Sequence, residues 1–567
     1  MDQQEATWLK RFLPGVASMA HYDRTWLRSD LVAGVSVAAV AVPVAIAYAQ
    51  LAGVPPVYGL YASILPLVAY AFMGTSRQLI VAPDAATCAM VATIVAPIAA
   101  GNSDRIVPLT MMLTLITGVF CIAGGLARMG FLTNFLARPI LTGYLNGIAL
   151  SIISGQLGRL FGFHLDSAGF FRLLVRFFSQ IGRTHVLTLV VGVATFALLR
   201  ILKHLGPKVP GPLVAMVLGI AASSFFRLSE HGVAMLGLIP AGLPALLIPN
   251  IGAQEWGPLV IGAAGLALIS FNSAMVTARG FAVKNHYDID SNQEFVALGV
   301  ADLGAGLMQG FAVSGADSRT AVNDSVGGKT QVTGLIASGL IVLVLLFLTA
   351  PLALLPITVL AAVLVNAALG LFDLESLVTL RKVSRPEFRL SILSTLGVIT
   401  LGVLPGVAIA VAMAMLLILI RASKPHDAVL GRMAGAGFRD MEIHPEAEAI
   451  EGLMIYRFDS SLLFFNSDFF KSRVKALVMN ATPKPRHFLL VAETMILLDT
   501  TGAATIEELV EEFSESGITF AIAQAKRPVR GMLERIGLSK KIGEDNLYPT
   551  IEAAVTALQP NARPEVV

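Results

Sequence analysis

The stretch SRQLIVAPDAATCAMVATIV, residues 76–95, decides the fold because it breaks an apolar run where a membrane span is expected. It starts as a short strand-like run, is interrupted at Pro83-Asp84 and continues as an apolar helical stretch. Non-helical backbone at membrane depth is tolerated only where it is buried in protein or lines a cavity. The segment is therefore expected inside a membrane protein, with a half-helix that begins near mid-membrane.

A second segment, QGFAVSGADSRTAVNDSVGGKT at 309–330, shows the same order. A strand-like run ends at Ser314-Gly315, and the polar residues that follow are Asp317, Ser318 and Arg319. Corresponding interruptions in the two halves of a transporter point to a central binding site. The beginning of a half-helix offers free N–H groups and the positive end of the helix dipole, which suit an anion. Two such ends facing each other predict an anion site.

The composition places the whole chain in a membrane. Of its 567 residues, 55% are hydrophobic and 14% are charged, whereas an average soluble domain is roughly 25% charged. The mean hydropathy of +0.74 excludes a soluble or disordered protein. Lys plus Arg number 41 against 38 for Asp plus Glu, so no strong field attracts nucleic acid. We expect a polytopic membrane protein.

Signals for catalysis or metal binding are lacking in the sequence. Cys88 and Cys121 lie in apolar stretches and fit neither a disulfide framework nor a CxxC metal site. The histidines show no metal-ligand spacing, and GGK at 327–329 lacks the upstream glycine of a P-loop. We therefore predict no enzyme, no ATP-driven pump, no cofactor and no metal.

Hydropathy divides the chain into three parts. Residues 1–28 are an N-terminal segment and residues 29–425 a transmembrane domain. Residues 426–567 are a linker followed by a soluble α/β domain, whose core lies at about 440–557. In the last part, apolar runs of strand length alternate with helical stretches, which indicates βαβ units. These runs are GLMIYRF (452–458), HFLLVAE (487–493) and ITFAIAQ (518–524).

Basic residues flank the first and the last apolar span. Arg24 and Arg28 precede the first, and Arg421 and Lys424 follow the last. By the positive-inside rule both termini are cytoplasmic if the number of spans is even. FFRLLVRFF at 170–178 is interpreted as an interfacial helix. We expect the chain in the cytoplasmic (inner) membrane, surrounded by lipid, with both termini in the cytoplasm.

Several long motifs resemble the sulfate permease (SulP) family of anion transporters. AVPVAIAYAQLAGVPPVYGLYASILPLVAYAFMGTSRQLIVAPDAA (41–86) resembles its signature, and RPILTGYLNGIALSIISGQLGRLFG (138–162) its fifth helix. SGADSRTAVNDSVGGKTQVTGLIAS (314–338) resembles its tenth helix. DTTG at 499–502, with the acidic helix after it, resembles a STAS domain. The resemblance covers nearly the whole chain.

The resemblance implies an α-helical fold with a seven-plus-seven transmembrane inverted repeat, at about 29–230 and 255–425, divided into core and gate domains. It also implies a cytoplasmic α/β STAS domain, a homodimer and elevator-like alternating access. The substrate is then bound between the third and tenth half-helices. The positions that match the family's site are Tyr48, Asp84, Ala85, Thr87, Asp317, Ser318 and Arg319.

The chain departs from the family pattern in its eighth helix. In SFNSAMVTARGFA (270–282), Asn272 takes a position that usually carries a carboxylate. An asparagine cannot titrate and coordinates a cation weakly, so coupling through Asn272 is in doubt and sodium is disfavoured. Asn272 is nevertheless kept among the candidate substrate-binding residues.

Asp84 and Asp317 have two interpretations. Asp is a favoured N-cap, so both can simply satisfy the free N–H groups of a half-helix. Alternatively they are proton-coupling carboxylates, because an intramembrane carboxylate is a functional candidate. An anion ~4 Å from an ionised Asp is repelled by ~4 kcal/mol at an effective dielectric of about 20. We expect a proton to bind together with the anion.

Three further residues also carry a structural alternative. Arg319 either pairs with Asp84 or Asp317, or offers its forked donors to substrate oxygens. Tyr48 either packs in the core or lies at the site. Thr501 aligns with the serine that is phosphorylated in STAS-type anti-sigma antagonists, but a turn-and-cap role before the acidic helix is favoured over a phosphosite.

The sequence thus predicts secondary active transport of a small anion by proton symport. The candidate substrates are sulfate, bicarbonate and a C4-dicarboxylate. An exchanger without cation coupling, a uracil/xanthine-type permease, a channel, and a non-transporting receptor or scaffold that signals through the STAS domain are the alternatives. A scaffold needs no polar mid-membrane site, so the polar interruptions argue against the scaffold.

Overall fold

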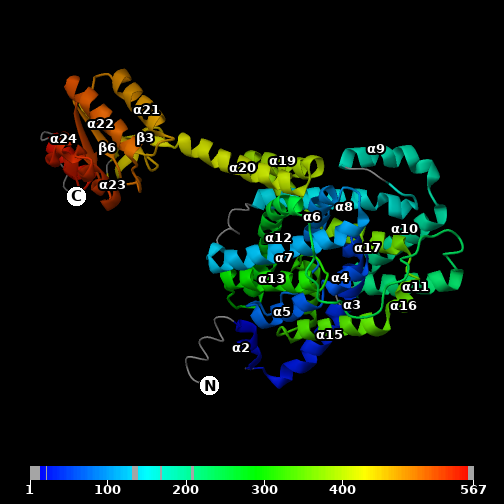
Figure 1. Cartoon of the computed structure of the whole chain (residues 1–567). Helices are drawn as coiled ribbons and strands as arrows, with labels where there is room; N and C mark the ends of the chain where they lie inside the picture. The colour runs from blue at the N-terminus through cyan, green and yellow to red at the C-terminus, as the bar shows by residue number, and fades with distance from the viewer. Residues whose placement is uncertain are drawn as a thin grey trace. The chain divides into compact units, whose positions relative to one another are not determined.

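A computed structural model describes residues 13–20, 22–130, 138–165, 169–205, 210–433 and 435–559. Much of the expected N-terminal segment, residues 1–12 and 21, lies outside these ranges, as does the end of the chain from 560 to 567. The chain forms two compact units, Met1–Ala412 and Met413–Val567, which we describe separately. Figure 1 colours their elements along the sequence.

The helices of the first unit sort into two bundles by their packing (Figure 1). We call the first the half-helix bundle, in which α13 packs on α7 and α5, α15 on α3 and α5, and α12 on α7 and α6. Its helices are α3 (Leu27–Ala52), α5 (Leu65–Met73), α6 (Ala85–Ala99), α7 (Ser103–Leu126), α12 (Trp256–Lys284), α13 (Ser291–Leu307), α14 (Asp317–Val326) and α15 (Val332–Phe347).

The second set, which we call the flanking bundle, has α8 at its centre, packed on α17 and α19, with α10 and α11 against α17. Its helices are α8 (Arg138–Phe161), α10 (Val186–Leu205), α11 (Gly211–Phe226), α17 (Ile357–Leu371), α18 (Leu374–Val383) and α19 (Arg385–Leu401). The other helices of at least four residues are α2 (Pro14–Ala20), α4 (Val57–Tyr61), α9 (Phe170–Gln180), α16 (Thr349–Leu352) and α20 (Val403–Ser423).

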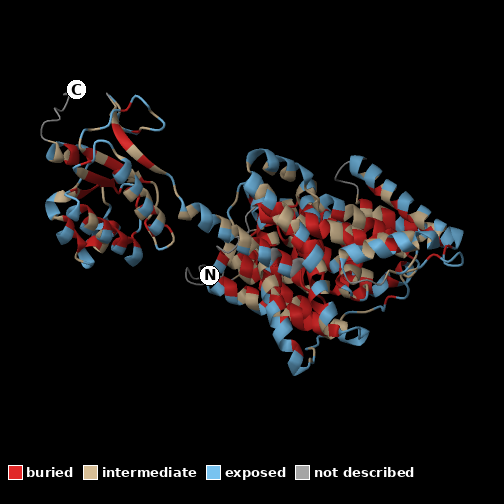
Figure 2. Cartoon of the chain, turned by 90° about the horizontal axis from the view of Figure 1, so that it is seen from above, coloured by how far each residue is buried: buried red, intermediate tan, exposed pale blue. Residues whose placement is uncertain are grey.

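In the part of the chain that the structure describes, six helices are long and apolar enough to cross a membrane. The half-helices α6 and α14 have only 15 and 10 residues, fewer than the ~20 needed for a span. Figure 2 shows buried residues concentrated in the interior of this unit and exposed ones around it. Many of the exposed side chains are large and apolar, such as Val193, Leu346 and Phe347, as expected of a surface in contact with lipid.

Both expected interruptions are present, and they lie side by side. The strand β1 (Val81–Ala82) precedes α6, and β2 (Ser314–Gly315) precedes α14. The two strands pair antiparallel, with Val81 opposite Gly315 and Ala82 opposite Ser314. A Cβ on Gly315 would lie 2.7 Å from the Cα of Ala274 in α12. Only glycine allows the strand pair to approach that helix so closely.

The same order of elements occurs twice in the half-helix bundle. α3, α5, β1 with α6, and α7 correspond to α12, α13, β2 with α14, and α15. The long helix of each set packs on the half-helix of the other, α3 on α14 and α12 on α6. This exchange brings the beginnings of the two half-helices together.

Polar side chains hold this arrangement from outside the strand pair. The amide of Gln331 donates to the carbonyl oxygens of Ser76 and Leu79, at 2.8 Å each. The carboxylate of Asp30 accepts from the backbone of Lys329 at 2.6 Å and from the hydroxyl of Thr330 at 2.6 Å. The Gly-Gly-Lys-Thr run therefore turns around a buried aspartate.

The second unit is built on a six-stranded sheet with strand order β4-β3-β5-β6-β7-β8. Strands β5 to β8 are parallel to one another, whereas β3 pairs antiparallel with β4 and β5. The three strands expected from the apolar runs are β5, β6 and β7. The strand bounds are β3 (Asp427–Met433), β4 (Gly437–Asp440), β5 (Leu453–Phe458), β6 (His487–Val491), β7 (Thr519–Ala523) and β8 (Leu547–Tyr548).

Alternate residues of these strands enter two separate cores, as the twofold period of a strand requires. Tyr456, Phe488 and Phe520 pack on one face, in a core that includes residues of α21 and α22. Ile455 and Leu489 face the other side, where α25 contributes. The helices of this unit are α21 (Ser467–Asn480), α22 (Thr500–Glu515), α23 (Arg527–Arg535), α24 (Leu538–Ile542) and α25 (Ile551–Leu558).

Candidate functional site

The candidate site lies where the two half-helices begin. Asp84 precedes α6 in an extended conformation, with φ −121° and ψ 149°, but its side chain makes no capping hydrogen bond. On the other side Ala316 is the N-cap, and Asp317 is already the first residue of α14. Asp317 instead accepts a hydrogen bond from the hydroxyl of Thr277 on α12. Asp317 therefore does not take the cap position that the structural interpretation assigned to it. Asp84 is the N-cap residue of α6, where its carboxylate interacts with the backbone N–H groups of Ala85 and Ala86.

Arg319 is the central residue of the site. Its side chain is 1% exposed, one guanidinium nitrogen donates to the carbonyl oxygen of Pro83, and its Cζ lies 5.7 Å from the centroid of the Tyr48 ring. The other two nitrogens, Nε and Nη1, have no hydrogen-bond partner among the described residues. Arg319 interacts electrostatically with Asp84 and Asp317, but among the described residues it forms no hydrogen bond or ion pair with either carboxylate.

Two further buried polar atoms near Asp84 have no partner in the described chain. They are the hydroxyl of Thr87, in the first turn of α6, and the hydroxyl of Tyr144 on α8. Tyr144 interacts electrostatically with Asp84. Buried polar groups in folded proteins are nearly always hydrogen-bonded. Unpartnered donors gathered around one half-helix terminus indicate a place built for a polar ligand.

A small cavity of about 50 Å³ opens beside these residues. Its polar lining comes from three helices, with Tyr144 on α8, Asn272, Ser273 and Thr277 on α12, and Asp317 on α14. A water molecule needs roughly 10–15 Å³ by this measure, so the cavity admits a small hydrated group. Tyr144, Ser273 and Thr277 were missed by sequence reasoning, because a tyrosine or hydroxyl residue in an apolar helix resembles ordinary packing.

The charges of the site form one electrostatic group. Asp84 interacts with both Asp317 and Arg319. Asp84 is half-buried, and Asp317 is exposed. With both carboxylates ionised, two negative charges and one positive charge leave a net charge of −1. An incoming anion meets net repulsion when both carboxylates are ionised.

The structure brings most of the candidate residues together. We call Tyr48, Asp84, Thr87, Asp317 and Arg319 the central site. Ala85 is buried as the first residue of α6, and Asn272 lines the adjoining cavity. Ser318 is exposed. Their role in substrate binding stays a prediction.

In the second unit, the expected capping role of Thr501 is wrong. Asp499 is the N-cap of α22 and accepts from the backbone of Gly502 at 2.7 Å and of Phe464 at 2.8 Å. Asp499 takes this role because it has the extended conformation just before the first helical residue, whereas Thr501 already lies within the helix. Thr501 is exposed, and phosphorylation there stays a prediction.

Comparisons with known proteins agree with this architecture. The model of the sulfate permease family matches residues 27–394, and that of the STAS domain matches residues 444–554. A probable sulfate transporter of Mycobacterium tuberculosis strain H37Rv is 40% identical over 547 residues, covering 96% of this chain and 98% of that protein. The chloroplastic sulfate transporter 4.1 of Arabidopsis thaliana is 28% identical over 551 residues, covering 94% and 80%.

Solved structures give the same fold. The murine Slc26a9 anion transporter in its inward-facing state has a TM-score of 0.91 and 23% identity, with 99% of this chain and 96% of that chain covered. The transmembrane domain of the cyanobacterial bicarbonate transporter BicA has a TM-score of 0.62 and 24% identity, with 69% and 98% covered. The expected helical membrane domain with a C-terminal α/β STAS domain is thereby confirmed.

Proposed function

Because this chain belongs to the sulfate permease family, and is an anion transporter and not an enzyme, we propose that its substrate is sulfate, carried by proton-coupled symport. The observation that carries this proposal is the buried Arg319, whose Nε and Nη1 have no partner in the described chain. Burying a charge is costly unless it is paired. A bound oxyanion supplies that pairing.

The geometry suits an oxyanion in particular. A guanidinium offers parallel N–H donors that match the oxygens of sulfate or a carboxylate. The beginnings of α6 and α14 add free N–H groups and the positive ends of two helix dipoles. Tyr48 lies against the guanidinium and orients it. The relatives named as sulfate transporters favour sulfate over bicarbonate and C4-dicarboxylates.

Coupling to protons rests on the two carboxylates of the central site. Asp84 and Asp317 interact with each other, and an anion close to them raises the repulsion further. Asn272, which lines the cavity between α8 and α12, cannot take up a proton. We assign proton binding to Asp84 and Asp317, and not to Asn272 or to sodium.

The transport cycle we propose is elevator-like. The half-helix bundle carries the central site past the flanking bundle, within a homodimer in the lipid of the cytoplasmic membrane. Both termini then lie in the cytoplasm. This assignment is supported by the two bundles of the first unit and by the basic residues Arg24, Arg28 and Arg421.

The test is uptake of labelled sulfate into proteoliposomes containing the purified protein, with and without an inward proton gradient. We expect gradient-stimulated uptake that excess unlabelled sulfate inhibits more strongly than bicarbonate or fumarate. Uptake that requires a preloaded anion and ignores the gradient would establish exchange in place of symport. Sulfate binding without flux would favour the receptor, and conductance far above carrier turnover would favour a channel.

A further inference from the structure

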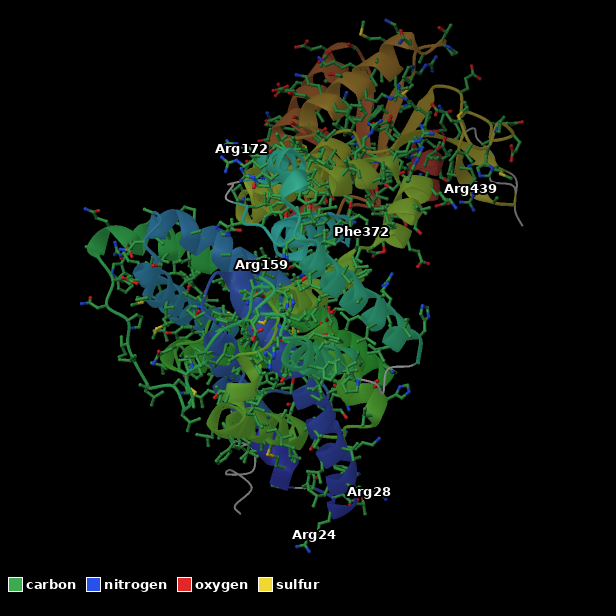
Figure 3. The ribbon with its side chains drawn as sticks, turned by 90° about the vertical axis from the view of Figure 1, so that its right-hand side faces the viewer. Arg24, Arg28, Arg159, Arg172, Phe372 and Arg439 are labelled. Atoms are coloured by element: carbon green, nitrogen blue, oxygen red, sulfur yellow. The ribbon has the colours of Figure 1, made fainter. Side chains whose placement is uncertain are left out.

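A second basic position lies apart from the central site, in a cavity of about 910 Å³. The ends of α3 and α8, the beginning of α7 and the loop 247–250 line this cavity. Arg159, near the end of α8, is its cationic residue. Figure 3 shows Arg159 among the helices, away from Arg24, just before α3, and from Arg28 at its beginning. Along α8 it is 15 residues beyond Tyr144, which corresponds to about 22 Å.

In the part of the chain that the structure describes, the guanidinium of Arg159 donates to neutral acceptors. Its Nη1 donates to the amide oxygens of Gln50 and Gln156, both at 3.2 Å. Within the described ranges, no carboxylate forms an ion pair with it. Arg159 is half-buried, so its charge is partly removed from water without being neutralised. Asp104 lines the same cavity but is exposed, where solvent screens its charge.

The bond between Arg159 and Gln50 also joins the two bundles, because Arg159 belongs to α8 and Gln50 to α3. Among the residues that the structure describes, we find no other side-chain hydrogen bond between a helix of the half-helix bundle and one of the flanking bundle. A ligand that binds Arg159 more strongly than a neutral amide does would compete directly with this hydrogen bond.

We propose that Arg159 is the centre of a second oxyanion-binding site, which takes sulfate or an anion of the same class and competes with Gln50 for the guanidinium. An anion adds Coulomb attraction to the hydrogen bonds from the guanidinium, which a neutral amide does not supply. Arg159 lines a cavity of ample size for such an anion. The choice of sulfate rests on the proposed function, whereas the site itself rests on Arg159 alone.

The test is calorimetric titration of sulfate into the full-length protein in detergent at low ionic strength, with central binding removed by Arg319→Gln. We expect the Arg319→Gln protein to keep one sulfate site. Adding Arg159→Gln should weaken this site at least tenfold. The matched control, Arg172→Gln on the exposed face of α9 in the same background, should change the dissociation constant less than twofold.

A second variant, Gln50→Glu, keeps the size of the side chain and places a carboxylate against Arg159. In the Arg319→Gln background it should abolish the remaining sulfate binding even if Arg159→Gln does not fold. No sulfate binding by the Arg319→Gln protein, or binding that survives both Arg159→Gln and Gln50→Glu, would overturn the site. The proposed function fails separately, if Arg319→Gln leaves sulfate uptake at its original level.

Discussion

Two buried polar clusters in the same bundle differ in how completely they are hydrogen-bonded. Asp30 is fully buried and accepts from Tyr22, from the backbone of Lys329 and Thr330, and from two threonine hydroxyls. Arg319 is equally buried, yet two of its nitrogens have no partner in the described chain. We propose that the satisfied cluster is structural and that the unsatisfied one is the binding site. The two clusters are equally buried, but they differ in the number of hydrogen-bond partners.

The largest loss of stability is expected for Asp30→Asn, in the fully hydrogen-bonded cluster. The amide presents donors to groups that are themselves donors, and we expect a loss of about 3 kcal/mol in stability, since hydrogen bonds to charged groups contribute ~1.5–3 kcal/mol each. The thermal unfolding midpoint in detergent measures it. The exposed Asp288→Asn is the matched control. An unchanged midpoint for Asp30→Asn would mean that its bonds are not structural.

At Arg319 the expected effect falls on transport and not on stability. Arg319→Gln should lower sulfate uptake at least 100-fold, a loss of about 2.7 kcal/mol in transition-state binding. Its unfolding midpoint should stay equal or rise, because a buried unpaired charge is removed. Arg200→Gln, at an exposed position of α10, should leave both quantities unchanged. Destabilisation of the Arg319→Gln protein with normal uptake per folded molecule would place Arg319 with Asp30 as a structural residue.

A third prediction concerns the two carboxylates of the central site and the coupling of uptake to protons. In the parent protein we expect an inward proton gradient to raise uptake about tenfold. The double variant Asp84→Asn with Asp317→Asn should show no such stimulation. The reason is that neither amide can take up a proton with the anion. Each single variant should keep part of the response. Gradient-dependent uptake by the double variant would assign coupling to other residues.

The smallest effect is expected at an ion-pair cluster of the second unit. Burial raises the pKa of Asp459, but hydrogen bonds from Arg457 and His426 outweigh it, so the pKa lies below its ordinary value of 3.8. A depressed pKa stabilises the fold above the unfolded-state value and loses this effect as the pH falls through the folded-state pKa. Asp459→Asn should therefore cost less than about 1 kcal/mol at pH 7.

This difference between Asp459→Asn and the parent protein should shrink as the pH falls below 3.8 and vanish below the folded-state pKa. Thermal midpoints of both proteins between about pH 2 and pH 7 measure it. A constant difference across that range would show that Asp459 acts through packing and not through its charge.

The sequence predicts the elements of the site better than their contacts. The breaks at Pro83-Asp84 and Ser314-Gly315 were visible because they interrupt apolar runs. Tyr144 was not, since its helix reaches the site only through tertiary packing. The bond from Arg319 to the Pro83 carbonyl spans 236 residues, and no local pattern specifies such a contact. Local propensity likewise favours Thr501 as the cap of α22, whereas the structure gives this role to Asp499.

The charges at the start of the two half-helices have a consequence for the membrane voltage. With both carboxylates ionised beside Arg319, the empty site carries −1. With a proton on each of Asp84 and Asp317 and a doubly charged sulfate bound, it again carries −1. A cycle of two protons and one sulfate then moves no net charge, so the ~2.3 kcal/mol per charge that 100 mV supplies neither drives nor opposes it. The cell would accumulate sulfate through its pH difference alone.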